Sequence, residues 1–332
     1  MNHLVLVLVL AALSAAAAAD HIPGANYTVW PMPRRLRPGK AALTVDAAQF
    51  TFVAGPGSGS APLSAAFGRY RAICFPHAGS STDGSTGGGA VLRSMTVRVA
   101  SPAAALAFGA DESYNLTLPG GASGGGGTIE AATIFGAYHA LETFAQLLRF
   151  DFDARRYIIE KGAALRIEDA PRFGWRELMV DTSRHFLPLR VLRQVVDSLT
   201  TAKLNVLHLH LVDAQAFPLV LPSRPLLAKG AYSAQERYTL ADLGDLQVRT
   251  MLLLLLVLLL VLLLMLLLLL LLLLLLLLLL LLTSFHLQVY AEARGVRLVA
   301  EIDTPGHAAS WCVGMPQVRI YMYKDPCCEL LK

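Results

Sequence analysis

Charged and imidazole side chains gather at the ends of three strand-like runs in the second half of the chain. These runs are GWRELMVDTS (174–183), KLNVLHLHLVD (203–213) and GVRLVAEID (295–303). The polar residues on or just after them are Asp181, Arg184, His185, His208, His210, Asp213, Asp303 and His307. Parallel strands bring their carboxyl ends to one edge of a sheet, where α/β enzymes place catalytic groups. The pattern therefore predicts a site that combines proton transfer with binding of a polar ligand.

Individual residues of this group allow alternative roles. Arg184 offers a planar fork that suits a polar ligand, although it could instead pair with Asp181; we favour ligand contact. Asp213 could orient His307 so that the imidazole bonds a substrate or a second acid. Asp303 begins a tight turn and could only cap backbone amides there.

The two histidines of the second run alternate along the strand. Because successive side chains of a strand point to opposite faces, His208 and His210 share one face and could in principle bind a metal. We favour packing inside the fold, and we predict neither a metal nor a cofactor.

A βαβ arrangement must position these residues. The helical stretch 188–202 joins the first two runs and places Leu189, Leu192, Val196 and Leu199 on one face. The stretch VYAEARG (289–295) precedes the third run. The runs are almost wholly apolar, as parallel strands covered on both faces must be. We therefore predict an α/β domain over residues 170–332, interrupted by a leucine tract at residues 251–282.

Residues 20–169 predict a separate, small α+β domain. Strand-like runs occupy 41–46, 91–100, 112–118 and 128–133, and Gly/Ser-rich loops separate them. One helix follows at 135–150, with a single apolar stripe, and two further strands, RYIIE and ALRIEDA, complete the domain. Several strands with one long helix against them are typical of an α+β domain.

The N-terminus predicts entry into the secretory pathway. Residues 1–19 form an apolar run ending in alanines, which is typical of a signal peptide, although an uncleaved anchor is the alternative. Asn26 and Asn115 begin Asn-X-Thr sequences and are expected glycosylation sites. The destination is a lysosome, a vacuole or the exterior. The four cysteines permit three disulfide pairings and lack metal-type spacing, and we expect scattered or partly free thiols.

Within the tract at 251–282, residues 252–282 are almost pure leucine and would extend about 46 Å as a helix, beyond the roughly 30 Å core of a bilayer. Since soluble-looking sequence flanks it, we favour a low-complexity insertion, with a membrane-inserting segment as the alternative. Membrane association is expected only through this tract. Among the 332 residues, 28 Lys and Arg against 24 Asp and Glu leave a charge of +4, which is too even for a nucleic-acid binder.

Several motifs resemble one enzyme family. PRFGWRELMVDTSRHFLPL, AKLNVLHLHLVDAQAFP and GVRLVAEIDTPGHAASW look like the first three strand-and-loop blocks of the β-N-acetylhexosaminidases of glycoside hydrolase family 20. DESYNLTLP and GAYHALETFAQLL resemble the noncatalytic α+β domain that precedes them. The resemblance covers residues 24–248 and 284–316.

The resemblance implies an (α/β)₈ TIM-type barrel that removes terminal β-linked N-acetylhexosamine from glycans with retention. The nucleophile would be the acetamido oxygen of the substrate, a recognised exception to the two-carboxylate scheme. By motif position, Arg184 would grip sugar hydroxyls, while Asp213 and His307 would support a general acid. The family often forms dimers through barrel surfaces, most of which are missing here, so the resemblance leaves open a homodimer of the full family fold.

The sequence departs from the family pattern in three respects. The Asp-Glu acid pair of the fourth strand block does not occur, and Leu209 stands where the family usually has Trp. The segment from residue 170 onward supplies about three strands, which predicts an incomplete barrel. We therefore expect negligible activity from this polypeptide. The alternative function is a noncatalytic, membrane-anchored glycan-binding or interaction protein.

Overall fold

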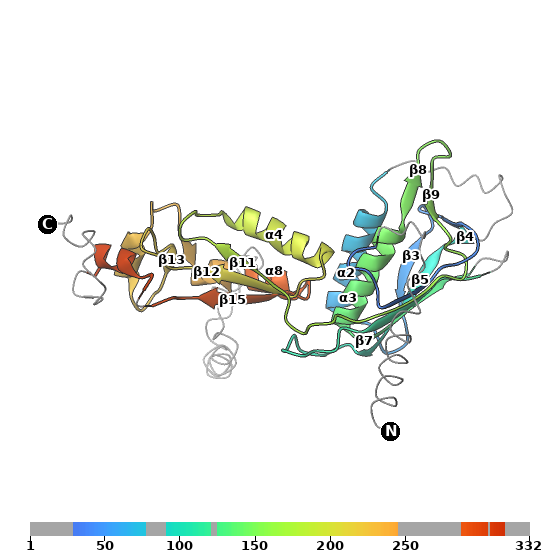
Figure 1. The fold of residues 1–332 in the computed structure, drawn as a ribbon, viewed down its shortest axis with the longest axis horizontal. Helices are drawn as coiled ribbons and strands as arrows, with labels where there is room; N and C mark the ends of the chain where they lie inside the picture. The colour runs from blue at the N-terminus through green and yellow to red at the C-terminus, as the bar shows by residue number, and fades with distance from the viewer. Residues whose placement is uncertain (1–28, 78–90, 121–124, 245–286, 305, 316–332) are drawn as a thin grey trace, which may run out of the picture. The chain divides into compact units, whose positions relative to one another are not determined.

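The computed structural model describes residues 29–77, 91–120, 125–244, 287–304 and 306–315. The chain divides into two compact units, Met1–Gly174 and Trp175–Lys332, which we call unit 1 and unit 2 (Figure 1). Each unit is described by itself.

Unit 1 contains two sheets. The larger has six strands in the order β1-β10-β6-β7-β5-β3, and the smaller has four in the order β4-β2-β9-β8. The strands are β1 (Arg35–Arg37), β2 (Leu43–Val45), β3 (Thr51–Ala54), β4 (Val91–Leu92), β5 (Ser94–Ser101), β6 (Tyr114–Thr117), β7 (Gly127–Thr133), β8 (Arg149–Asp151), β9 (Arg156–Ile159) and β10 (Arg166–Asp169). β3, β5 and β7 run parallel, whereas β6 is antiparallel to both β7 and β10.

Two helices pack on one face of the larger sheet, α2 (Ala61–Cys74) and α3 (Ile134–Leu147) (Figure 1). The Thr133 side chain accepts hydrogen bonds from two backbone amides and so begins α3. Ser60 caps α2 in the same way, with a proline in its first turn. The expectation of a single helix in this part of the chain was therefore wrong, because α2 is a second one.

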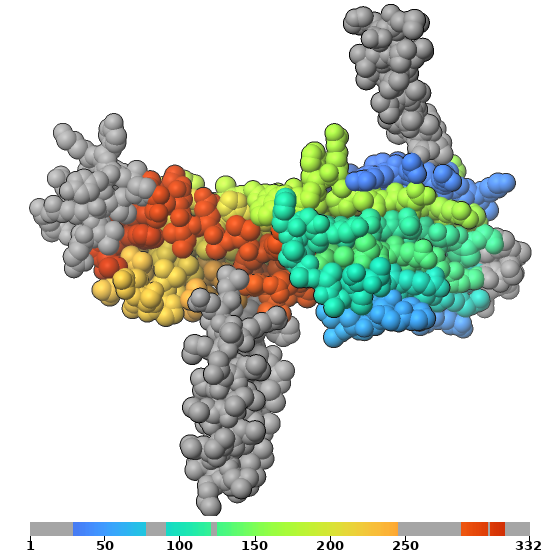
Figure 2. All heavy atoms as spheres, turned by 90° about the horizontal axis from the view of Figure 1, so that it is seen from below, coloured from blue at the N-terminus to red at the C-terminus, as the bar shows by residue number. Residues whose placement is uncertain are grey.

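The core of unit 1 lies between these helices and the sheet. Alternate residues of the strands point inward, as Met95 and Val97 of β5 and Ile129 of β7 do, and all three are fully buried. The opposite face of the sheet is open. Figure 2 shows this face, on which the strands follow one another as bands of colour and none of the described helices lies over them.

Unit 2 is built on a parallel sheet of β11 (Glu177–Asp181), β12 (Val206–His210) and β15 (Arg297–Glu301), in that order. α4 (Leu189–Thr201) connects β11 to β12, and α8 (Leu287–Glu292) precedes β15. These elements confirm the predicted α/β class. In the part of the chain that the structure describes, the three strands form an open sheet and not a closed barrel.

The two faces of β12 differ in chemistry. Leu207 and Leu209 are fully buried and belong to the cluster that includes Leu192, Val196 and Leu199 of α4. His208 and His210 point to the other face. Shorter elements complete the unit: β13 (Leu219–Val220), η1 (Pro225–Gly230), β14 (Tyr238–Thr239), α5 (Leu240–Leu243) and η2 (Ala309–Val313).

Several predictions fall on residues outside the described ranges. These are the signal peptide at 1–19, the acceptor Asn26 and the leucine tract at 251–282. Among the helices that the structure does describe, none combines the length and apolar character needed to cross a bilayer. Cys74 is a free thiol and is buried.

Candidate active site

The carboxyl ends of the three parallel strands of unit 2 meet at one edge of the sheet. Hydrogen bonds continue past the strand ends there. Both the backbone amide and the hydroxyl of Thr182 donate to the carbonyl of His210, at 3.1 and 3.0 Å. The amide of Leu211 donates to the carbonyl of Glu301 at 3.1 Å. These bonds fix the loops that follow β11 and β12, and therefore fix the side chains that those loops carry.

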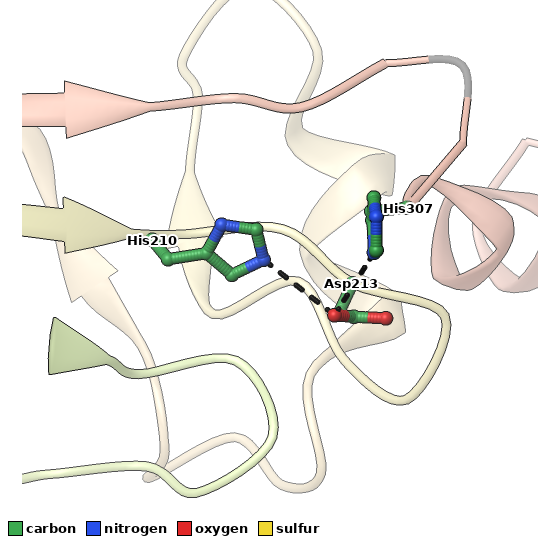
Figure 3. A group of neighbouring side chains, drawn as sticks. All are labelled: His210, Asp213 and His307. Carbon is green, nitrogen blue, oxygen red and sulfur yellow. Dashed lines mark hydrogen bonds and ion pairs between the residues drawn. The ribbon is translucent and has the colours of Figure 1, made fainter. Parts of the chain in front are cut away.

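Asp213 lies at the centre of the polar cluster at this edge. Its side chain is only 4% exposed, and its Oδ2 atom forms an ion pair with the Arg184 guanidinium. The same oxygen lies 3.2 Å from Nδ1 of His307 and 3.5 Å from Nε2 of His210 (Figure 3). The structure thus brings together the three residues that the sequence singles out, Arg184, Asp213 and His307, from three separate loops.

The backbone around Asp213 is also fully engaged. Its amide donates to the carbonyl of Ala216 at 3.0 Å, and its carbonyl accepts a 2.6 Å hydrogen bond from the hydroxyl of Ser310. The second carboxylate oxygen accepts from the amide of Ala214 at 2.6 Å. Because both carboxylate oxygens and both backbone polar groups have partners, the carboxylate has one defined position.

The structure bears on both roles that the sequence allows for Arg184, namely pairing with Asp181 and contact with a ligand. Its guanidinium bonds Asp181 at 2.6 Å as well as Asp213, so the pairing alternative occurs. The side chain nevertheless remains 43% exposed. A guanidinium has five N–H donors, so donors remain for a ligand. The hydrogen bond with Asp181 raises the pKa of Arg184, which keeps the group cationic.

Burial by itself raises the pKa of Asp181, but hydrogen bonds from Arg184 and from the amide of Ser183 outweigh it. The pKa of Asp181 is therefore lowered, and the carboxylate stays ionised. Asp181 in this way anchors the first strand end to the arginine.

Glu301 is a member of the cluster that the sequence analysis missed. It bonds Nδ1 of His210 at 3.0 Å and Nε2 of His208 at 2.8 Å, and so bridges the two histidines. Burial lowers the pKa of His210, yet the hydrogen bond that His210 donates to Glu301 prevails and that pKa is raised. Conversely, the hydrogen bond from His210 lowers the pKa of Glu301.

Asp303 and His185 are the remaining candidates from the sequence. Asp303 lies 3.4 Å from Nε2 of His307, so it contacts the cluster and does not only cap a turn. The rings of His210 and His307 meet edge to face, with centroids 5.8 Å apart. His185 is exposed and forms no ion pair with the described members of the cluster.

His210, Asp213 and His307 are also close enough to be tested as metal ligands, since one donor atom from each lies within 4.8 Å of the others. The neighbourhood disfavours a cation. The oxygen of Asp213 that would bind it already pairs with the positive Arg184. In addition, the raised pKa of His210 favours a proton on the imidazole, and a metal needs the neutral ring.

Comparison with known proteins places these features in a family. The model of the glycosyl hydrolase family 20 catalytic domain matches residues 173–252 and 283–329, and a model described as "beta-acetyl hexosaminidase like" matches residues 29–147. The first match omits residues 253–282, which contain most of the leucine tract.

Individual relatives agree with these matches. "Beta-hexosaminidase 1" of Arabidopsis thaliana is 37% identical over 92% of this chain and 50% of its own length. "Beta-hexosaminidase subunit B2" of Dictyostelium discoideum is 31% identical over 87% of this chain and 43% of its own length. The solved chitobiase of Flavobacterium johnsoniae is 25% identical, with a TM-score of 0.60 over 87% of this chain and 36% of its own.

The two units and the acidic, imidazole-rich strand edge therefore fit the α/β class of the glycosyl hydrolase family that the comparisons identify. The chain belongs to glycosyl hydrolase family 20. It spans about half the length of the curated relatives that it matches.

Proposed function

We propose that the Asp213 cluster is part of the sugar site of a β-N-acetylhexosaminidase, which hydrolyses terminal N-acetylhexosamine residues of glycans. The observation that carries this proposal is the convergence of Arg184, His307 and His210 on one buried carboxylate. Three strand ends supply these groups, which give the site a cation that can bind sugar hydroxyls and side chains that can control a proton.

Each residue has a distinct part in the proposal. Arg184 donates to adjacent sugar hydroxyls through the N–H groups that Asp181 and Asp213 leave unused. Asp213 pairs with both Arg184 and His307. One carboxylate therefore positions the residue that binds the sugar and the residue that takes part in proton transfer. His307 then adjusts the proton affinity of a neighbouring carboxylic acid.

The proposed reaction is retaining and assisted by the substrate. The acetamido oxygen attacks the anomeric carbon while a general acid protonates the leaving oxygen, and water then opens the cyclic intermediate. The general acid and the carboxylate that orients the acetamido group are the Asp-Glu pair of the family pattern, which this sequence does not contain. β11, β12 and β15 would be the first three strands of the TIM-type barrel.

A general acid alone accounts for about 10² to 10⁴ in rate. We therefore propose that the 332-residue polypeptide by itself binds the sugar but hydrolyses an aryl N-acetylglucosaminide no faster than buffer. Clear turnover by the purified chain would refute the second part of this proposal.

The first part is tested by saturation-transfer NMR with N-acetylglucosamine. Arg184→Lys keeps the charge but loses the planar fork, so binding should weaken about tenfold. Arg190→Lys is the matched control, because Arg190 is exposed on α4 and should leave binding unchanged. Equal binding by the parent and by Arg184→Lys would remove the basis for the sugar site.

A further inference from the structure

The open face of the six-stranded sheet in unit 1 carries a polar groove that takes no part in the proposed hydrolysis. The groove has a volume of about 540 Å³. This lies within the roughly 300–1,000 Å³ range of small-molecule sites. Its lining includes Arg34, Arg35, Asn115, Glu130 and Glu168. All five side chains are exposed.

The strand register places Asn115 at the middle of a charged row. Glu168 of β10 lies opposite Asn115 on one side, and Glu130 of β7 lies opposite it on the other. Arg35 pairs with Glu168 at 3.2 Å, and Arg98 pairs with Glu130 at 3.4 Å. Directly opposed residues of neighbouring strands have Cβ atoms roughly 5 Å apart, so both carboxylates flank the asparagine closely.

Asn115 is also the acceptor of an Asn-Leu-Thr sequence. Leu116 points inward and is fully buried, whereas Asn115 points out of the sheet and is exposed. Thr117, two residues further on, shares the outward face. The modifiable amide therefore projects into the groove and not beside it.

We propose that Asn115 carries an N-linked glycan, and that its first two N-acetylglucosamine units lie in this groove. In the modification, the amide nitrogen of Asn115 bonds to C1 of the sugar as the bond from C1 to a lipid pyrophosphate breaks. The pyrophosphate leaves as an anion, and the amide gives up one proton. This reaction depends on the predicted secretory routing and not on the hydrolase site of unit 2.

The groove offers acceptors that suit sugar hydroxyls. Arg35 engages one oxygen of Glu168, and Arg98 engages one oxygen of Glu130. The other oxygen of each carboxylate has no protein partner in the described ranges, and can accept from a hydroxyl. At the groove end, Arg34 supplies a guanidinium that already reaches the carbonyl of Pro171 at 2.8 Å and retains further donors.

The test begins with the full chain translated into eukaryotic microsomes, followed by peptide mass spectrometry. We expect a glycan on Asn115, which the variant Asn115→Gln removes. Asn26 serves as the reference acceptor for entry into the lumen. An unmodified Asn115 overturns the proposal, whether or not Asn26 is modified.

Docking in the groove is then tested by releasing the glycan from the native protein with a peptide N-glycosidase. Release from Asn115 should be about tenfold slower in the folded chain than after denaturation, the effect of one or two net hydrogen bonds. The double variant Glu130→Ala and Glu168→Ala should lose this protection. The control Glu160→Ala should keep it, because Glu160 pairs with Arg149 on the smaller sheet. Equal release rates before and after denaturation, or unchanged protection in the double variant, would overturn the docking.

Discussion

Removing the charge of Glu301 should weaken proton binding by His210. Glu301→Gln preserves the size of the side chain but replaces an ionic hydrogen bond of 3.0 Å to Nδ1 of His210 with a neutral one. Hydrogen bonds to charged groups contribute about 1.5–3 kcal/mol, and about 1.4 kcal/mol corresponds to tenfold in proton affinity. Since the Glu301 side chain is 33% exposed, the lower end applies, and we expect about tenfold weaker proton binding.

The assay is a pH titration of the ¹³C-labelled histidine rings by NMR. His210→Gln identifies the signal of His210, and Glu292→Gln is the matched control because Glu292 is exposed on α8. In the parent, His210 should titrate above the ordinary histidine value of about 6.5. A His210 signal that titrates alike in the parent and in Glu301→Gln would refute the assigned role of Glu301.

The same pair makes stability depend on pH. The folded-state pKa of His210 is raised, so its contribution is fully present below about pH 6.5 and is lost as pH rises through the folded-state pKa. Urea unfolding should therefore show the parent losing stability over this interval more steeply than Glu301→Gln. Parallel pH profiles for the two proteins would contradict this linkage.

Three further predictions concern packing and reactivity. Gly136→Ala should destabilise unit 1 by about 1–3 kcal/mol in thermal or urea unfolding, because a Cβ there would lie 2.4 Å from the carbonyl of Ser113, whereas Gly59→Ala meets no atom within 4 Å and should be nearly neutral. Leu209→Ala should cost about 2–5 kcal/mol in urea unfolding because Leu209 is fully buried, and a cost below about 1 kcal/mol would contradict that packing. Cys74 should resist a thiol reagent in the native chain and react after denaturation, as measured by peptide mass spectrometry, because burial raises the pKa of the Cys74 thiol; equal labelling in the two states would disprove its burial.

The elements of unit 2 could be predicted because local patterns specify them. The apolar stripe of α4 and the strand-like run that contains β12 are visible in the sequence, and both elements form at the expected positions. The convergence of Arg184, Asp213 and His307 could also be predicted, since parallel strands end at a common edge.

Two features escaped prediction for different physical reasons. α2 buries Leu63, Ala66, Tyr70 and Cys74, and the small Ala and Cys give its buried stripe little contrast with the rest of the helix. Glu301 was missed because its role depends on the register between β12 and β15, in which it lies opposite His210. That register joins residues far apart in sequence, and only the parity of side chains along the two strands hints at it.

The two-sided chemistry of β12 has a consequence for how the chain tolerates change. If β12 slipped by one position against its neighbours, His208 and His210 would face the apolar side chains of α4, and Leu207 and Leu209 would face the polar side of the sheet. Both the hydrophobic and the polar side chains of β12 therefore oppose a shift in register. This information resides within the strand itself. Alignment of β12 with β15 therefore does not require a connection of one fixed length between α5 and α8.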